Sequence, residues 1–323
     1  MGDPAGIGGE IALKAWLSQK SQPFFIIDDA VRLKQLSEKL GLGVPVAEIR
    51  TAAETVKAFT TALPVLNLAL ATNAIPGQPD AENGKSIIAS ITTAVDMVRS
   101  GEASAVVTNP IHKKTLYDAG FEFPGHTEFL AQLAKIDTPP VMMLASPELR
   151  VVPVTVHVSI ADALSNLNEN DIVTMATITA QALEKDFAIR GPRLAVCGLN
   201  PHAGEEGAMG QEETTIIAPA IDTLKNRGID ASGPWPPDTL FHDAARKTYD
   251  AAICMYHDQA LIPIKTLDFD GAVNVTLGLP FVRTSPDHGT AFNIAGTGKA
   301  SERSLLAALD MAAEMATRRS GLP

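Results

Sequence analysis

The chain has 323 residues, of which 46% are hydrophobic and 20% are charged, as in ordinary globular proteins. This length predicts about two lobes, and the formal net charge of -11 disfavours nucleic acid as a partner, because such binding needs clustered lysine and arginine. The longest uncharged stretch, residues 58–79, is interrupted by Pro64, Pro76 and Pro79, so we expect neither a membrane-spanning helix nor membrane binding.

Short apolar runs alternate with amphipathic segments along the chain. The runs predicted to be strands are 24–27, 63–68, 103–107, 141–144, 194–197 and 251–255. The segments predicted to be helices, with apolar residues every three to four positions, are 30–40, 85–98, 171–187, 212–226 and 304–317. This alternation predicts an α/β fold with a largely parallel sheet covered by helices.

The opening residues, 2–10, form a glycine-rich stretch that resembles a turn leading into a helix, but they match neither a dinucleotide fingerprint nor a P-loop. No basic region followed by an apolar segment opens the chain, so nothing marks it for secretion. Cys197 and Cys254 lie in apolar runs and are expected to be buried thiols of a reducing compartment. We therefore expect a cytoplasmic protein.

Residues 125–130 (GHTEFL) read as a turn into a helix. Thr127 is predicted to cap that helix, and the N–H groups beside it could receive a phosphate. Helix capping alone explains a threonine at position 127 about as well as phosphate binding does.

Three histidines lie at or near the ends of predicted strands. Alternation in residues 151–159 places His157 on the polar face of a strand, with Thr155 and Ser159. His202 lies in a glycine-rich loop after the strand that ends at Cys197, and His257 directly follows the apolar run 251–255.

A single histidine of this kind is most often a hydrogen-bonded structural residue. Three at equivalent positions favour a divalent cation, because neutral imidazoles bind zinc, cobalt, manganese or iron, and three ligands leave an open catalytic position. Asp258, next to His257, could orient an imidazole or act as a base.

Polar residues after His257 suggest anion binding. Lys265, Asn274 and Arg283 are expected near successive strand ends, and lysine with arginine suits carboxylate or phosphate recognition. The segment 287–296 (DHGTAFNIAG) could be a loop whose glycines permit unusual backbone angles.

Long motifs then identify a family that the whole chain resembles. They are GDPAGIGGE from Gly2, TNPIHKKTL from Thr108, GHTEFLA from Gly125, GLNPHAGEEG from Gly198, PPDTLF from Pro236, MYHDQALIP from Met255 and NVTLGLPFVRTSPDHGTAFNIAG from Asn274. In this order they resemble the PdxA family, the 4-hydroxythreonine-4-phosphate dehydrogenases of vitamin B6 biosynthesis. The segment HGTAFNIAG also resembles the nucleotide-binding loop of isocitrate and isopropylmalate dehydrogenases.

The resemblance implies a two-lobed α/β/α fold like that of those dehydrogenases. It implies a nucleotide-side lobe of residues 1–125 plus 283–323, and a metal-binding and dimerisation lobe of residues 126–282. The implied metal ligands are His157, His202 and His257. The implied substrate contacts are His126, Thr127, Lys265, Asn274 and Arg283. The implied cofactor contacts are His288, Gly289, Thr290, Ala291, Asn293 and Ile294.

The implied reaction is oxidation of 4-phosphooxy-L-threonine at C3 by NAD or NADP, followed by decarboxylation to 3-amino-2-oxopropyl phosphate. One divalent cation per site (zinc, magnesium, manganese or cobalt) would assist both steps. Lys265 and Asp258 are the catalytic candidates, and either Asp258 or solvent bound to the cation is the base. The family also implies a homodimer with its site at the subunit interface.

Three departures from the family pattern stand out. Gly9 replaces a usual proline, Ala260 replaces a frequent glycine, and no strand precedes the turn at Gly2, which suggests a shortened amino terminus or a misplaced start. Related enzymes that oxidise threonate or erythronate 4-phosphate are the main alternative. Another relative acts on a dihydrodiol dicarboxylate without phosphate, and the anion-contact residues retained in this chain argue against that activity. A metal-dependent phosphatase or a non-catalytic binding protein is disfavoured because neither needs the dinucleotide loop.

Overall fold

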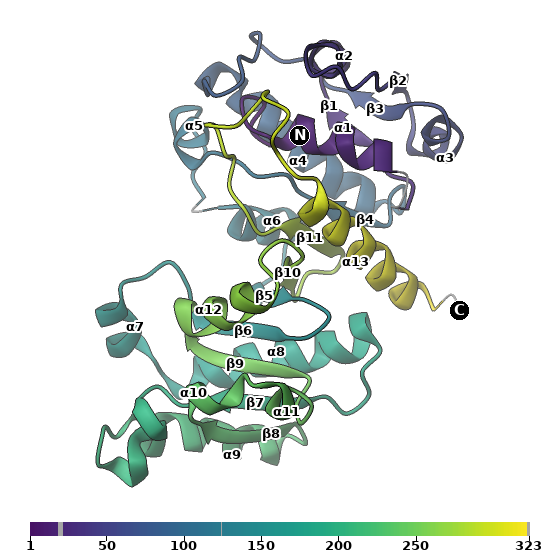
Figure 1. Ribbon diagram of the computed structural model, residues 1–323. Coiled ribbons are helices and arrows are strands. Elements are labelled where there is room, and N and C mark those ends of the chain that lie inside the picture. The colour runs from purple at the N-terminus through teal and green to yellow at the C-terminus, as the bar shows by residue number, and fades with distance from the viewer. Residues whose placement is uncertain (19–21, 124, 322–323) are drawn as a thin grey trace. The chain divides into compact units, whose positions relative to one another are not determined.

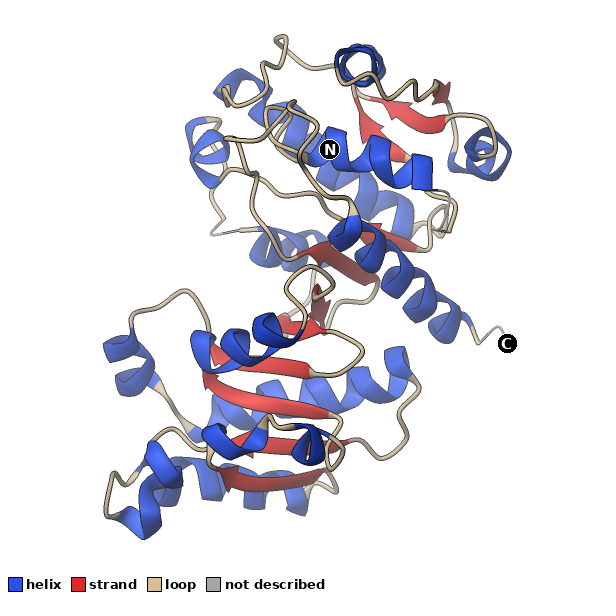
Figure 2. Ribbon diagram, in the orientation of Figure 1, coloured by secondary structure: helices blue, strands red, loops and turns tan. Residues whose placement is uncertain are grey.

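A computed structural model describes residues 1–18, 22–123 and 125–321. The chain forms two compact units: unit 1 comprises Met1–Asp137 and Leu279–Ala316, and unit 2 comprises Thr138–Gly278 with the chain from Thr317 on. Figure 2 shows strands and helices alternating in both units. Compared with the expected lobes, unit 1 additionally includes residues 126–137 and 279–282.

Unit 1 contains parallel strand pairs surrounded by helices. One sheet has the order β1-β3-β2, and β4 pairs in parallel with β11. The strands are β1 (Ile26–Asp28), β2 (Val46–Ile49), β3 (Leu63–Asn67), β4 (Ala105–Val107) and β11 (Val282–Pro286). The helices are α1 (Gly8–Ser18), α2 (Ala30–Lys39), α3 (Thr55–Phe59), α4 (Gly84–Arg99), α5 (Lys113–Asp118), α6 (His126–Ala134) and most of α13 (Arg303–Ser320).

Unit 2 contains a sheet with the strand order β10-β5-β6-β9-β7-β8. The pairs β6-β9, β9-β7 and β7-β8 are parallel, whereas β10-β5 and β5-β6 are antiparallel. The strands are β5 (Val141–Ala145), β6 (Arg150–Thr155), β7 (Arg193–Cys197), β8 (Asp230–Trp235), β9 (Ala251–Tyr256) and β10 (Val273–Leu277). Both faces of the central strands are buried, which explains their continuous apolar sequences.

Helices cover both faces of this sheet (Figure 1). On one face lie α8 (Glu169–Phe187) and α9 (Ala218–Asn226), and on the other lie α10 (Pro237–Leu240), α11 (Asp243–Arg246) and α12 (His257–Leu267). The short helix α7 (Ile160–Asn166) follows β6, a 3-10 segment (Pro201–Gly207) follows β7, and a π-helical turn (Glu213–Ile217) leads into α9.

The structure confirms the predicted α/β class with mostly parallel strands. Each predicted strand and helix overlaps an observed one, with boundaries moved by a few residues. Cys197 and Cys254 are buried free thiols, as expected, with their Sγ atoms 3.7 Å apart. No helix in the described part of the chain has the length and apolar character needed to cross a bilayer.

Candidate functional site

Three adjacent parallel strands of unit 2 carry the three histidines. β6, β9 and β7 lie side by side, so their carboxyl ends share one edge of the sheet. His157 follows β6, His257 follows β9 and His202 follows β7. The structure thus confirms the predicted positions of His202 and His257 after strand ends, and it places these ends where α/β proteins build their sites.

His157 and His257 lie next to each other, with their ring centroids 6.0 Å apart. A metal-to-nitrogen distance of about 2.0–2.1 Å places the ring centres of two ligands of one cation about 5–6.5 Å apart. The two imidazoles therefore fit a shared cation. The prediction that His157 lies within a strand is wrong, because β6 ends at Thr155 and His157 has a φ of 38°.

Beyond β6 the expected alternation of buried and exposed side chains stops. Val158, which the same alternation would place on the apolar face of the strand with Val152 and Val154, has a relative exposure of 53%. The chain turns at His157 into α7, so its side-chain directions no longer follow the pleat of a strand. A left-handed backbone at a non-glycine residue is uncommon and is often found at functional sites.

Asp258 contacts His257 directly. A 2.7 Å hydrogen bond joins His257 Nδ1 and Asp258 Oδ1, and His257 is the first residue of α12. A carboxylate on Nδ1 leaves Nε2 as the nitrogen available to a cation, as in many metal-binding histidines. The geometry fits the orienting role considered for Asp258.

His202 lies in a loop with an unusual backbone. Residues 202–206 all have φ between 44° and 77°, the left-handed region. In the described residues, no three histidine, cysteine, aspartate or glutamate side chains converge closely enough to hold a cation. The structure therefore pairs His157 with His257, and it does not bring His202 into a three-ligand cluster with them.

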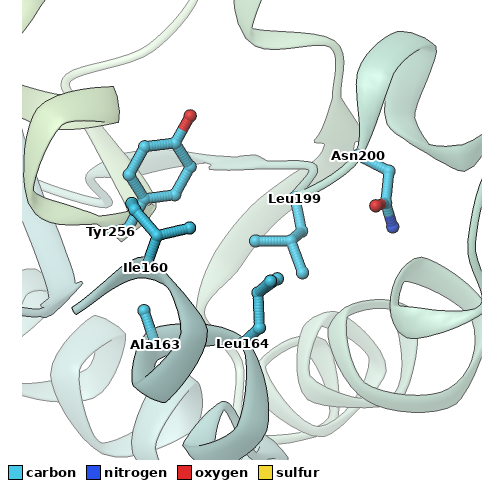
Figure 3. Close-up of a pocket in the computed structure, with 6 residues that line it drawn as sticks. All are labelled: Ile160, Ala163, Leu164, Leu199, Asn200 and Tyr256. Atoms are coloured by element: carbon cyan, nitrogen blue, oxygen red, sulfur yellow. The ribbon is translucent and has the colours of Figure 1, made fainter.

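An apolar pocket of unit 2 lies beside the segments that carry the histidines (Figure 3). Ile160, Ala163 and Leu164 come from α7, Leu199 and Asn200 follow β7, and Tyr256 ends β9. In Figure 3 the side chains of Leu199 and Leu164 lie between Tyr256 and Asn200. Burial raises the pKa of Tyr256, so its hydroxyl is neutral at ordinary pH.

Unit 1 holds two of the predicted anion contacts, Arg283 and His126, close together. Arg283, 4% exposed, donates a 2.6 Å hydrogen bond from Nη2 to Thr108 Oγ1. Burial lowers the pKa of Arg283 to about 10, so the guanidinium remains charged at neutral pH. Thr108 was not predicted as a site residue, although it begins one of the quoted motifs.

His126 begins α6, and its Nε2 atom is buried without a hydrogen-bond partner among the described residues. Burial, with the charge of Arg283 adding to it, holds the pKa of His126 well below its usual value of 6.5. In the tautomer with its proton on Nε2, this imidazole has a free N–H donor beside the charge of Arg283, which suits contact with an anionic ligand.

Several predicted positions differ from the structure. Gly125 is the N-cap of α6, so Thr127 lies within the first turn and the capping prediction is wrong. Lys265 lies in the last turn of α12, with its Nζ 5.2 Å from the ring centre of Phe269, whereas Asn274 and Arg283 are near the beginnings of β10 and β11. The expectation that these three lie at the carboxyl ends of strands is therefore wrong. Lys265 lies in a helix, and Asn274 and Arg283 are each the second residue of a strand.

The predicted cofactor residues form a loop that follows β11. Thr290 accepts a 3.1 Å hydrogen bond from Ile7 N, so the loop packs against the glycine-rich turn at the amino terminus. A Cβ on Gly6 would lie 3.0 Å from Thr290 O, which shows how closely the two backbones approach. The Nε2 atom of His288 is buried with no hydrogen-bond partner in the described ranges, and Ala291 has a φ of 45°.

Fold and site together define an α/β protein of two units, with imidazole side chains at the carboxyl ends of adjacent parallel strands. The family described as "Pyridoxal phosphate biosynthetic protein PdxA" matches residues 19–312. The chain belongs to this family.

Known relatives match nearly the full length of the chain. A protein of Bradyrhizobium diazoefficiens named 4-hydroxythreonine-4-phosphate dehydrogenase is 57% identical to this chain. The match covers 99% of this chain and 96% of that protein. A protein of the same name from Caulobacter vibrioides is 52% identical, covering 98% and 96% respectively.

Solved structures agree with this result. A crystal structure of 4-hydroxythreonine-4-phosphate dehydrogenase from Klebsiella pneumoniae has a TM-score of 0.88 at 37% identity and covers 98% of both chains. A terephthalate 1,2-cis-dihydrodiol dehydrogenase from Burkholderia xenovorans has a TM-score of 0.64 at 28% identity, covering 100% of this chain and 96% of that chain.

Proposed function

We propose that this protein is an oxidoreductase, a 4-hydroxythreonine-4-phosphate dehydrogenase that requires NAD or NADP and a divalent cation. The observation that carries this proposal is the match over 98–99% of the chain to relatives of that name, at 52–57% identity. The protein would act in the biosynthesis of pyridoxal phosphate, in agreement with the description of the family.

The proposed reaction has two steps. A base removes the proton of the C3 hydroxyl of 4-phosphooxy-L-threonine while hydride leaves C3 for the nicotinamide of NAD(P)+, giving a β-keto acid. This acid loses CO2 and takes up a proton to yield 3-amino-2-oxopropyl phosphate. A bound divalent cation supplies Lewis-acid stabilisation of the negative charge that develops on oxygen in both steps.

His157, His202 and His257 are the proposed ligands of this cation. The 6.0 Å separation of His157 and His257 supports two of them, and the position of His202 after the neighbouring strand supports the third. Zinc, cobalt and manganese suit imidazole ligands, and magnesium is the further candidate. Asp258 orients His257 through its bond to Nδ1 and is also the proposed protein base.

The proposed anion contacts are Arg283, His126 and Thr127 in unit 1, and Lys265 and Asn274 in unit 2. Arg283 supplies a fixed, charged pair of donors for phosphate or carboxylate, because its side chain is buried and bonded to Thr108. Lys265 supplies a second positive charge on α12, the helix that begins with His257.

Residues 288–294 are the proposed cofactor loop, which assigns nucleotide binding to unit 1 and metal binding with dimerisation to unit 2. Exposed apolar side chains of unit 2 support a homodimer with its site at the subunit interface, among them Val158, Ile160 and Leu164. Two buried free thiols are compatible with a reducing cytoplasm.

The substrate choice is tested by comparing kcat/KM for 4-phosphooxy-L-threonine with that for threonate 4-phosphate and erythronate 4-phosphate. We expect 4-phosphooxy-L-threonine to be preferred, with stoichiometric release of CO2. A higher kcat/KM for either of the other phosphates would reassign the protein to a neighbouring activity of the family.

A further inference from the structure

A buried glutamine joins the two strand ends that carry His257 and His202. Gln259, 6% exposed, lies in the first turn of α12. Its Oε1 accepts a 2.6 Å hydrogen bond from Met255 N in β9, and its Nε2 donates a 2.8 Å hydrogen bond to Gly198 O after β7. The side-chain amide thus uses a donor and an acceptor to fix the spacing between the two segments.

A buried glutamate holds the same loop from the other side. Glu213, 5% exposed, accepts hydrogen bonds at Oε1 from Leu199 N (2.8 Å) and Asn200 N (2.7 Å). Its Oε2 accepts a third bond, 2.9 Å long, from Asn200 Nδ2. Glu213 begins the π-helical turn before α9, a type of helix that occurs frequently at functional sites.

The loop closes tightly over this carboxylate. A Cβ on Gly204 would lie 2.5 Å from Glu213 Oε2, and one on Gly198 would lie 2.9 Å from Ala203. His202 lies between these two glycines, in the run of left-handed residues. Such backbone angles cost free energy at non-glycine residues and persist only when neighbouring contacts hold them in place.

We propose that Gln259 and Glu213, together called the bracket, are positioning residues that hold the loop of His202, a proposed cation ligand, in a fixed conformation after β7. This inference rests on the proposed metal-binding function. Neither side chain is a proposed ligand, because their hydrogen bonds go to the backbone of residues 198–200 and 255 and to the side chain of Asn200. The bracket supplies the support that a metal-binding loop needs, since ligand affinity depends on how rigidly each donor is held.

The first test measures binding of Co2+ alone to metal-free protein by titration calorimetry and by the visible absorption of the bound ion. In Gln259→Met the side chain keeps its length and loses both hydrogen bonds. In Glu213→Gln the new amide NH2 group faces Asn200 Nδ2, which is also a donor, so this hydrogen bond is lost. We expect the Co2+ dissociation constant to rise about 10- to 100-fold in both variants, with an altered absorption spectrum.

Two matched controls separate positioning from general damage. Glu212→Gln makes the same change at the adjacent residue, whose carboxylate bonds only the side chain of Asn200 among the loop groups (2.7 Å), and Gln181→Met makes the glutamine change on the exposed surface of α8. Both controls should bind Co2+ within about threefold of the wild type. Wild-type affinity and spectrum in the bracket variants would overturn the proposal.

The second test does not depend on the cation. Hydrogen exchange of the metal-free protein should show faster exchange of the amides of residues 198–204 in both bracket variants, with the strands of the sheet still protected. If the wild type binds no Co2+, the proposed metal site fails, and exchange alone then decides the role of the bracket. Unchanged protection of residues 198–204 in both variants would overturn it.

Discussion

Arg283 combines burial with a fixed charge. Its guanidinium donates a hydrogen bond to Thr108, and its charge adds to the burial that lowers the pKa of the neighbouring His126. A fork of donors with a delocalised charge binds phosphate or carboxylate at two points, which a lysine ammonium cannot do.

We therefore expect Arg283→Lys to raise KM for the phosphorylated substrate about 10- to 100-fold, because one of two charge-assisted hydrogen bonds is lost. Steady-state kinetics with varied substrate measures this change. Arg50→Lys, at an exposed position of unit 1, is the matched control and should leave KM unchanged. An unchanged KM in Arg283→Lys would remove Arg283 from the substrate site.

The lowered pKa of His126 predicts that the stability of the protein depends on pH. The pKa of this histidine is below 6.5 in the folded protein, so as the pH falls through about 6.5 the unfolded chain takes up a proton that folded His126 does not bind. This contribution to stability is complete above the unfolded pKa and is lost as the pH falls towards the folded pKa. The stabilising form is the neutral imidazole.

The expected result is a smaller loss of melting temperature in His126→Gln than in the wild type between about pH 7.5 and about pH 5.5. Scanning calorimetry at several pH values measures it. The exposed His242 provides the control substitution, and His242→Gln should follow the wild-type curve. Parallel curves for all three proteins would show that His126 has no such linkage.

Asp258 has two proposed roles that one variant separates. In Asp258→Asn the charge that strengthens the bond to His257 Nδ1 is lost, and we expect cation affinity to fall about tenfold. Turnover is measured at saturating cation. Recovery to the wild-type value would leave orientation as the only role and eliminate Asp258 as the base, whereas a persistent loss would support its role as base.

The three histidines could be predicted as a metal site because each lies within or after an apolar run of the sequence. The substrate and cofactor contacts came from the family motifs. The sequence did not reveal the turn at His157, because the alternation of residues 151–159 continues past the last strand hydrogen bond. The bracket was also not predicted. Gln259 and Glu213 both bond backbone groups of residues 198–200, between 13 and 61 residues away in the sequence, and neither residue type nor spacing shows such contacts.

At the level of elements, Glu10 connects α1 to the segment that follows the candidate cofactor loop. This fully buried carboxylate accepts hydrogen bonds from Gly296 N (3.1 Å), Ala300 N (3.0 Å) and Lys14 Nζ (3.1 Å). It thereby fixes the far end of the loop to the first helix. The amino-terminal motif that ends in Glu10 was a weak signal on its own.

Glu10→Gln should lower the free energy of unfolding by about 1–3 kcal/mol, because a charged acceptor is replaced and an amide N–H is forced against backbone donors. It should also weaken NAD(P) binding by loosening the loop. Urea unfolding and cofactor titration measure the two effects. Glu38→Gln, on the exposed side of α2, should change neither, and an unaltered Glu10→Gln protein would contradict this role.

Elements with a strong hydrophobic period were predictable, and their boundaries were less so. β8 was not predicted, because Gly233 and Pro234 interrupt its sequence, and an edge strand tolerates them where a central strand would not. The predicted helix 212–226 begins instead with a π-helical turn, which its apolar spacing does not distinguish from an α-helix.

Gly9 stands where the family pattern has proline. It leaves space for Arg32, because a Cβ at this position would lie 3.0 Å from both Nη atoms of Arg32.

At the scale of the whole molecule, length and alternation predicted two α/β parts, and the structure confirms the class. Division of the chain depends on contacts between distant segments, such as the parallel pairing of β11 with β4. Those contacts carry no local signal, since proline and glycine are spread over many turns and mark no linker. The overall activity was recognisable because motifs from both units occur in one order.

We infer that this chain couples substrate oxidation to a cation held by His157, His202 and His257. The direct measurement strips the purified protein with a chelator, restores zinc, magnesium, manganese or cobalt separately, and follows the absorbance of reduced nicotinamide with 4-phosphooxy-L-threonine. We predict that absorbance rises only when substrate and a restored cation are both present, for at least one cation and either NAD or NADP. Absence of hydride transfer with every cation, or full activity in the chelated protein, would show that the protein does not catalyse a cation-dependent oxidation of this substrate.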